Sequence, residues 1–249
     1  QLVSYELPIV LAVASVALAG SSLSLATLSD RWSPWWMLWQ LPGAVGFVLD
    51  KARWRINPSY LPGFMFRYLA AADPQGPWQP IWDGYLRLAP QIFAAGVAPD
   101  NVVVDAAGRV LPDTERAPSA SYDGIRVYLW AGMSGANSQA LVSRLAPYAA
   151  LTRSRGMPPE KVDPASGVAL PSDYSPIGFS AALLPFLSAL GDRATLEQQQ
   201  QRVRSAAQRA SLGEKTHYYD QVLVLFGTGW LAAQYRFDAQ GRVQPRWAR

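Results

Sequence analysis

The residues best suited to chemistry lie in the stretch from Ser121 to Met133. Within it, Asp123 and Arg126 supply one carboxylate and one guanidinium, and Trp130 adds an aromatic ring. These three residues stand at i, i+3 and i+7, so a helix would place them on one face, next to an apolar face that packs on the core. Such an arrangement is suited to carrying a buried catalytic carboxylate.

A structural role accounts for the same residues. Ser121 has the residue type of a helix N-cap, which accepts a hydrogen bond from the first turn. An aspartate in that turn, here Asp123, is favoured by the helix dipole and by the free backbone N–H groups. The spacing alone therefore leaves a helix cap and a catalytic carboxylate as alternatives.

Five further blocks of sequence accompany this stretch in a fixed order. They are Leu41–Phe47, Trp54–Pro62, Pro158–Asp163, Pro176–Leu187, and Tyr218–Leu223 running on to Gly229 and Trp230. With the Ser121 stretch, they closely resemble the family 8 glycoside hydrolases, in particular the periplasmic endoglucanases associated with bacterial cellulose synthase. The resemblance covers the C-terminal part of the family's domain, so residues 41–249 are predicted to belong to it.

The resemblance implies an activity and a set of roles. It implies an inverting endoglucanase, a cellulase that hydrolyses β-1,4-glucosidic bonds in cellulose-like glucans. Asp123 would be the catalytic base, which Arg126 would keep ionised and oriented. Tyr60 would contact the sugar at the cleavage point and Asn57 would position its loop, although the same block also suits a turn before a helix. An inverting site also needs a carboxylic acid roughly 6.5–9.5 Å from the base.

The family's general acid has no counterpart in this sequence. That glutamate belongs to a Ser-Glu-Gly-Gln-Ser-Tyr-Gly-Met type of block, and neither this block nor the Ser-Asp-Gly-Asp block after it occurs here. None of the chain's five glutamates has such a setting: Glu6, Glu115, Glu160, Glu197 and Glu214. Two alternatives to an active hydrolase therefore stay open, a catalytically inactive glucan-binding remnant and a membrane-anchored helical protein.

Residues 1–40 do not match the family. No charged residue occurs from Leu7 to Ser29, and the apolar core of this run is similar to a secretory signal that ends in Ala-x-Ala. Its length would also permit a membrane span, so membrane contact is predicted only if residues 7–28 act as an anchor. A tryptophan-rich stretch follows, and the abrupt change at Leu41 is also typical of a truncated or frame-shifted gene.

Composition excludes several classes of function. The net charge of +4 comes from scattered Lys and Arg residues, which argues against nucleic-acid binding. The absence of cysteine rules out disulfides and thiolate chemistry, and His217 is the only histidine. No cofactor or metal is implied, because the hydrolysis needs only carboxylates and water. The expected partners are β-1,4-glucan chains and the cellulose synthase complex, in a bacterial periplasm or outside the cell.

The apolar spacing is mainly helical. Two hairpins that turn at glycines, at Val102–Leu111 and Tyr235–Val243, interrupt the helices. The sequence thus predicts a mainly α protein of the (α/α)6-barrel type that its resemblance implies, incomplete at the N-terminal side. Besides the helix after Ser121, the predicted helices are Ser59–Ala72, Trp78–Ala95, Ala136–Ser154, Ile177–Leu190, Arg193–Leu212 and Tyr218–Tyr235.

Overall fold

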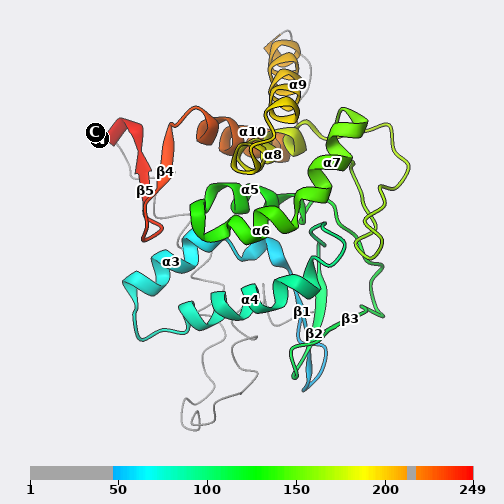
Figure 1. Cartoon of the computed structure of the whole chain (residues 1–249), viewed down its shortest axis with the longest axis vertical. Coiled ribbons are helices and arrows are strands. Elements are labelled where there is room, and N and C mark those ends of the chain that lie inside the picture. Colours follow the sequence, from blue (N-terminus) through cyan, green and yellow to red (C-terminus); the bar gives the residue numbers. More distant parts are fainter. Residues whose placement is uncertain (1–46, 212–216, 249) are drawn as a thin grey trace.

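The computed structural model describes residues 47–211 and 217–248. This part of the chain is mainly helical and carries two small antiparallel sheets (Figure 1). The α-helices are α3 (Gly63–Ala72), α4 (Trp78–Ile92), α5 (Ile125–Met133), α6 (Gln139–Arg144), α7 (Ala146–Arg155), α8 (Ile177–Leu190), α9 (Arg193–Ser211) and α10 (Tyr218–Leu231). The strands are β1 (Arg53–Ile56), β2 (Val102–Asp105), β3 (Val110–Leu111), β4 (Tyr235–Phe237) and β5 (Val243–Pro245). The 3-10 helices are η1 (Pro58–Tyr60), η2 (Gly135–Ser138) and η3 (Arg246–Ala248).

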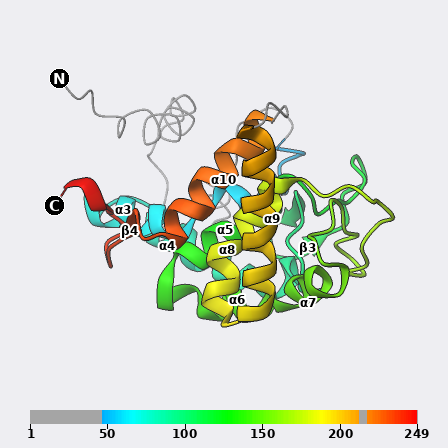
Figure 2. The ribbon, with the colours of Figure 1, turned by 90° about the horizontal axis from the view of Figure 1, so that it is seen from above.

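The central helix of the described chain is α8. It packs against α5, α9 and α10, which surround it in the view from above (Figure 2). Its sequence is apolar nearly all round, and Phe179, Leu183 and Phe186 have no exposed surface. A helix that is apolar on every side is stable in water only when neighbours cover every side. The composition of α8 therefore requires the neighbours that the structure gives it.

Two glycines let the backbones of this helix layer touch. A Cβ atom on Gly227 of α10 would lie 1.9 Å from the carbonyl oxygen of Ala181 in α8. A Cβ atom on Gly132 of α5 would lie 2.2 Å from the backbone nitrogen of Phe186, also in α8. No side chain fits at either distance, so both positions need glycine for α5, α8 and α10 to pack this closely.

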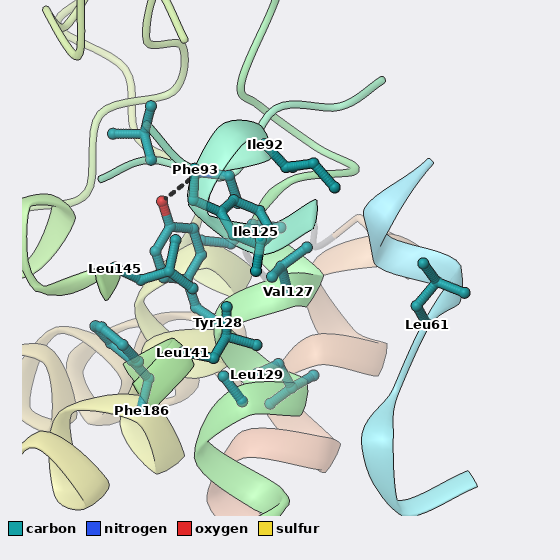
Figure 3. Packing of buried hydrophobic residues seen from close by; sticks show 14 of the residues in the cluster. Leu61, Ile92, Phe93, Ile125, Val127, Tyr128, Leu129, Leu141, Leu145 and Phe186 are labelled. Atoms are coloured by element: carbon teal, nitrogen blue, oxygen red, sulfur yellow. Dashed lines mark hydrogen bonds between the residues drawn. The ribbon is translucent and has the colours of Figure 1, made fainter. Parts of the chain in front are cut away.

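The hydrophobic core continues from α8 through α5 towards α6 and α4 (Figure 3). Tyr128 of α5 is 1% exposed and stacks on Tyr148, with ring centroids 4.4 Å apart. Its buried hydroxyl oxygen accepts a hydrogen bond of 2.9 Å from the backbone N–H of Ala98. The segment that leads to the candidate site is thereby fixed to α5, since a buried hydroxyl group needs its partner.

The three-stranded sheet brings the Asn57–Tyr60 loop to the helix layer. Its order is β1-β2-β3, with antiparallel pairs throughout. Arg55 of β1 is 1% exposed, and its Nε donates a 2.5 Å hydrogen bond to Asp113 Oδ2. That hydrogen bond lowers the pKa of Asp113 to about 2. The sheet and this ion pair anchor the strand that ends at Ile56, directly before η1.

The hairpin of β4 and β5 connects α10 with α3. Phe237 of β4 stacks on Phe64 of α3 with ring centroids 3.8 Å apart, and it also packs on Trp230 of α10. At the hairpin turn, Gly241 has a φ of 77°, and a Cβ atom there would lie 1.8 Å from the carbonyl oxygen of Phe64. This turn therefore needs glycine for its conformation and for its close contact with α3.

The structure confirms the mainly helical prediction and both hairpins, and it corrects several boundaries. The bounds of α8 are those predicted. The prediction of one helix over 136–154 is wrong: α6 ends at Arg144 and α7 begins at Ala146, because Pro147 lacks an N–H and favours a helix start. The helix predicted over 218–235 ends at Leu231. No strand is predicted at Arg53–Ile56, where the structure has β1.

The predicted signal or anchor at residues 7–29 lies outside the described residues. Within the described ranges, no helix combines the length and the apolar character needed to cross a membrane. The assignment of residues 1–40 therefore stays a prediction.

The close approach at Gly227 leads to a first prediction. Gly227→Ala should lower the free energy of unfolding by at least about 2 kcal/mol, because the new methyl group collides with the backbone of α8. The matched control is Gly229→Ala in the same helix, where the methyl group would meet the ring of Tyr235 at 3.1 Å, a side chain that can move. Denaturant titrations of both variants test this, and equal losses of stability would contradict it.

Candidate active site

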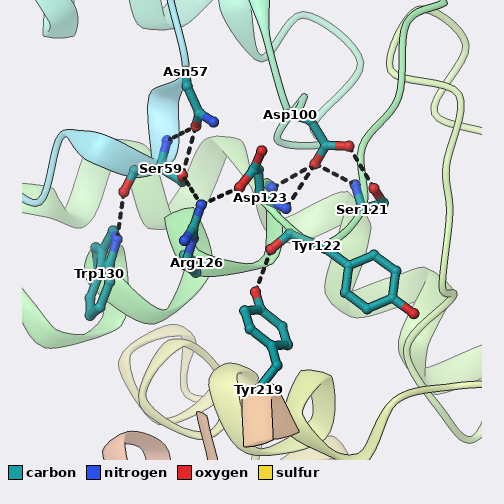
Figure 4. A network of polar contacts seen from close by, with 10 residues as sticks. Asn57, Ser59, Asp100, Ser121, Tyr122, Asp123, Arg126, Trp130 and Tyr219 are labelled. Carbon is teal, nitrogen blue, oxygen red and sulfur yellow. Dashed lines mark hydrogen bonds and ion pairs between the residues drawn. The ribbon is translucent and has the colours of Figure 1, made fainter. Parts of the chain in front are cut away.

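The candidate active site lies where η1 meets the N-terminal ends of α5 and α10 (Figure 4). Arg126 of α5 donates a hydrogen bond to Ser59 of η1, and Tyr219 of α10 donates one to the backbone oxygen of Tyr122. The start of α8 joins this group, because Asp220 Oδ1 of α10 accepts a 2.8 Å hydrogen bond from its Gly178 N–H. Several helix N-termini therefore face the site, which favours negatively charged groups there.

Asp123 lies in a tight turn directly before α5, and Asp100 holds this turn. Asp100 Oδ1 accepts backbone N–H hydrogen bonds from Ser121 at 2.8 Å, Asp123 at 3.1 Å and Gly124 at 2.8 Å. Its Oδ2 accepts the hydroxyl of Ser121 at 2.5 Å. One carboxylate thus satisfies backbone donors that would otherwise be left free at the start of the helix.

This arrangement corrects the predicted cap. Ser121 is not the N-cap: the helix begins at Ile125, and Gly124 occupies the N-cap position without a side-chain cap. The charged Asp100 takes the capping role that was predicted for Ser121, since a carboxylate accepts stronger hydrogen bonds than a hydroxyl does. The turn also needs a glycine, because a Cβ atom on Gly124 would lie 2.1 Å from the carbonyl oxygen of Ala98.

Arg126 joins Asp123 to the η1 loop. One of its terminal nitrogens donates to Asp123 Oδ1 and also to Ser59 Oγ, the latter at 2.8 Å. The Asp123 side chain is 39% exposed and that of Arg126 is 24% exposed. The pair is therefore open to solvent on one side, and the helical spacing predicted from the sequence brings these two groups into contact. Arg126 Nε is buried without a hydrogen-bond partner among the described residues.

Asn57 holds the η1 loop from within. Its side chain is not open to solvent, since the residue is 3% exposed. Its Oδ1 accepts hydrogen bonds from the N–H and the hydroxyl of Ser59, at 3.0 and 2.6 Å. Trp130 of α5 fixes the same loop from the other side, because its indole N–H donates to the Ser59 carbonyl at 2.9 Å. The loop is thus tied to α5 by side chains on both elements.

Tyr60 is the exposed aromatic residue of this loop. It is 47% exposed, and its ring lies below the guanidinium of Arg126, with the guanidinium carbon 5.4 Å from the ring centroid. A cation over an aromatic face helps to hold the ring in one orientation. The structure therefore brings together all four residues singled out in the sequence: Asn57, Tyr60, Asp123 and Arg126.

Two further tyrosines line the same region, and the sequence gives no role for them. Tyr122 donates its hydroxyl to Glu160 Oε1 at 3.0 Å, and Tyr219 packs beside it with ring centroids 5.9 Å apart. The pKa of Tyr122 rises to about 12, mainly through burial and then through its hydrogen bond to Glu160. The pKa of Tyr219 also rises to about 12 because of burial. Both phenols therefore stay neutral hydrogen-bond donors at ordinary pH.

The described glutamates have other partners or lie elsewhere. Glu115 accepts a 3.0 Å hydrogen bond from the buried Arg55 of β1. Glu160 accepts hydroxyl groups with both oxygens, and Glu197 lies on the exposed side of α9. The remaining two glutamates fall outside the described residues. Within the described ranges, no cluster of three or more His, Cys, Asp or Glu side chains could hold a metal ion.

The capping role of Asp100 leads to the second prediction. Asp100→Ala should destabilise the protein by about 1–3 kcal/mol, because three backbone N–H groups lose their acceptor. Asp100→Asn keeps one oxygen in place and should retain most of the stability. Amide hydrogen exchange should show faster exchange at Ser121, Asp123 and Gly124 in the alanine variant only. An Asp83→Ala control on the surface of α4 should leave these amides unchanged.

Comparisons with known proteins assign the chain to a family. The sequence model of glycosyl hydrolases family 8 matches residues 37–233. An endoglucanase of Xanthomonas axonopodis pv. citri (strain 306) is 46% identical over 211 residues, which are 83% of this chain and 53% of the relative. An endoglucanase of Escherichia coli (strain K12) is 37% identical over 214 residues, which are 83% of this chain and 54% of the relative. The chain thus spans about half the length of these relatives.

A solved structure agrees with this grouping. The endo-1,4-D-glucanase from Vibrio fischeri ES114 superposes with a TM-score of 0.74 at 31% identity, over 84% of this chain and 60% of that one. The mainly helical architecture with its few short strands is that of the (α/α)6 barrel of the same family. Family match, sequence identity and fold lead to one conclusion: the chain belongs to family 8 of the glycosyl hydrolases.

Proposed function

We propose that this chain carries the base side of an inverting endoglucanase site that hydrolyses β-1,4-glucosidic bonds in cellulose-like glucans. The observation that carries the proposal is the contact of Asp123 with Arg126 and, through Arg126, with the loop of Tyr60. The Asp123 carboxylate is half-exposed, and a cation holds it beside an exposed aromatic ring. A general base next to a sugar site needs this accessibility and this fixed position.

In this proposal, Asp123 activates the attacking water. Its Oδ1 is held by Arg126, and no described side chain donates a hydrogen bond to its Oδ2. Oδ2 can therefore accept a proton from a water molecule as that water attacks the anomeric carbon. The bond to the leaving oxygen breaks at the same time, and that oxygen takes its proton from a carboxylic acid on the other side of the sugar.

Tyr60 and the loop behind it would bind the sugar. An exposed aromatic face can pack on the C–H face of a pyranose ring, and the position of Tyr60 beside the proposed base allows this. Asn57 has no direct contact role in this proposal, because it is buried and acts through Ser59. Arg126 both orients Asp123 and supports the ring of Tyr60.

The acid that completes the pair would come from outside the described residues. The described glutamates other than Glu197 accept hydrogen bonds from arginine or from hydroxyl groups, so they are placed as acceptors rather than proton donors. The same observation favours a second candidate function, namely a glucan-binding protein that does not hydrolyse its ligand. Substrate binding would then survive without catalysis.

We place the protein in the bacterial periplasm or outside the cell, with a role linked to cellulose production. The support for this is the resemblance to endoglucanases that accompany cellulose synthase, together with the apolar run that precedes the family match. Its partners would be β-1,4-glucan chains, and an association with the cellulose synthase complex is part of the same proposal.

The assigned base gives the third prediction. Asp123→Asn should reduce the release of reducing ends from carboxymethylcellulose by at least about 100-fold, because the amide cannot take the proton from water. The control is Asp83→Asn on the surface of α4, which should keep the parent rate. If Asp123→Asn releases reducing ends as fast as the parent does, Asp123 is not the base. A parent that binds cello-oligosaccharides without cutting them would favour the second candidate function.

The exposed ring gives the fourth prediction, which needs no catalysis. Tyr60→Ala should weaken the binding of cello-oligosaccharides about tenfold, a loss of about 1.4 kcal/mol, because the stacking face is gone. Tyr60→Phe keeps the ring and should bind nearly as well as the parent. Calorimetric titration measures this, with Trp247→Ala as the control, since Trp247 is 74% exposed in η3. Equal affinities for parent and Tyr60→Ala would show that Tyr60 does not bind the sugar.

A further inference from the structure

An open pocket lies where helix α9 passes the end of α7 and the start of α8 (Figure 1). Gly156, at the C-cap of α7, and Ile177, the first residue of α8, contribute to its lining. Its volume is about 500 Å³, which is within the range of pockets that hold small molecules. We call it the α9 pocket, because its other lining residues all come from that helix: Gln198, Gln201, Arg202, Ser205 and Arg209.

The lining residues of α9 form one polar stripe. Counted from Gln198 they stand at i, i+3, i+4, i+7 and i+11, a spacing that places side chains on one face of a helix. Two of them are arginines and none is acidic. Glu197, the acidic residue in the sequence of α9, does not belong to the stripe. The helix therefore turns positive charge and hydrogen-bonding groups towards the pocket.

Arg202 is the half-buried cation of this pocket. Its Nη1 donates a hydrogen bond to Ser180 Oγ, and its Nη2 donates one to the Ser175 carbonyl at 3.4 Å. Both acceptors are neutral, and no described carboxylate pairs with Arg202. Arg126 and Arg153 differ in this respect, because each of them forms an ion pair with an aspartate. The described residues thus hold the guanidinium of Arg202 in place without balancing its charge.

The surroundings of Arg202 disfavour a positive charge. Burial lowers the pKa of its guanidinium, and the positive charge of Arg209 lowers this pKa further. An arginine nevertheless stays protonated at ordinary pH. Its hydrogen bonds to Ser180 and Ser175 leave further N–H donors, and a guanidinium can bind an oxyanion through two parallel hydrogen bonds. An anion in the pocket would therefore compensate a partly desolvated cation.

The other polar groups of the pocket suit a ligand with hydroxyl groups. Gln198 Oε1 accepts a 3.2 Å hydrogen bond from Gln199, and no described group accepts one from the Gln198 NH₂ group. Ser205 Oγ accepts a hydrogen bond of 3.4 Å from Gln201 and keeps its own proton to donate. Amides and hydroxyls both donate and accept, as sugar hydroxyls do. The pocket of about 500 Å³ also far exceeds the volume of one liquid water molecule, about 30 Å³, so it has room for more than an inorganic ion.

We propose that the α9 pocket binds a small sugar that carries an anionic group, either a phosphate or a carboxylate. Arg202 binds the anionic group in this proposal, and Arg209 adds positive potential that attracts it. The side chains of Gln198, Gln201 and Ser205 bind hydroxyl groups of the sugar. None of the lining residues belongs to the candidate active site, so this binding does not depend on the proposed function.

Calorimetric titrations of the full chain test the proposal. Glucose 6-phosphate and glucuronate carry the two kinds of anionic group, whereas glucose and inorganic phosphate each lack one half of the proposed ligand. Gln198→Glu places a negative charge in the pocket and keeps an oxygen that can accept the hydrogen bond from Gln199. The matched control is Gln200→Glu, which makes the same change in the same helix at a residue that does not line the pocket.

The parent should bind glucose 6-phosphate or glucuronate at least about tenfold more tightly than it binds glucose or inorganic phosphate. The tighter of the two anionic sugars identifies the anionic group. Gln198→Glu should weaken this binding at least about tenfold through charge repulsion, and Gln200→Glu should change it by less than about twofold. Arg202→Lys keeps the charge but loses the planar guanidinium, so it should weaken the binding about fivefold.

A variant of the candidate active site, Tyr60→Ala, should bind the anionic sugar as tightly as the parent does. If this variant loses the binding, the ligand occupies the candidate active site and the proposal is wrong. The proposal also fails if neither anionic sugar binds the parent at up to roughly 10 mM, or if the two glutamate variants weaken binding equally. Equal affinity for inorganic phosphate would mean an adventitious ion only, and equal affinity for glucose would mean that no anionic group is recognised.

Discussion

The candidate site depends on the hydrogen bonds that Asp100 accepts from the turn before α5. These bonds hold the backbone of Asp123 and Gly124 in place, so the carboxylate of Asp123 reaches Arg126 without a side-chain cap of its own. Arg126 in turn reaches Ser59, and Ser59 is fixed by Asn57. A partly buried chain of contacts therefore runs from Asp100 to the η1 loop. It starts at a charged acceptor, and charged acceptors form stronger hydrogen bonds than neutral ones.

The helix layer supplies the rigid background for this chain of contacts. Glycines at the crossing points bring α5 and α10 onto α8 at backbone distance, so the helix starts have little freedom to shift relative to one another. Asp220 adds a polar tie between the starts of α10 and α8. The starts of α5, α8 and α10 are thus tied together by hydrogen bonds at one side of the layer, where Asp123 also lies.

Sequence reasoning succeeded where a pattern is local and failed where a contact is long-range. The bounds of α8 follow from its continuous apolar composition, and the meeting of Asp123 with Arg126 follows from helical spacing. The role of Asp100 could not be predicted, because its hydrogen bonds reach 21, 23 and 24 residues along the chain and no motif surrounds it. Strand β1 is defined by its pairing with β2 rather than by its own four residues. Gln199 belongs to a run of four glutamines at 198–201, a composition typical of a solvent-exposed surface, yet it is fully buried and accepts a hydrogen bond from Ser180.

The β4–β5 hairpin has a consequence for the order in which the protein can be completed during synthesis. Phe64 in α3 meets the edge of the Trp130 ring, but the ring stacked on its face is that of Phe237, so α3 leaves the ribosome long before this part of its cover exists. At roughly 5–20 residues per second, the delay is on the order of 10–35 s. During that time, the nascent chain exposes an aromatic surface that chaperones or other nascent chains can bind. The synthesis of strand β4 therefore decides when the Phe64 ring of α3 gains its stacked neighbour.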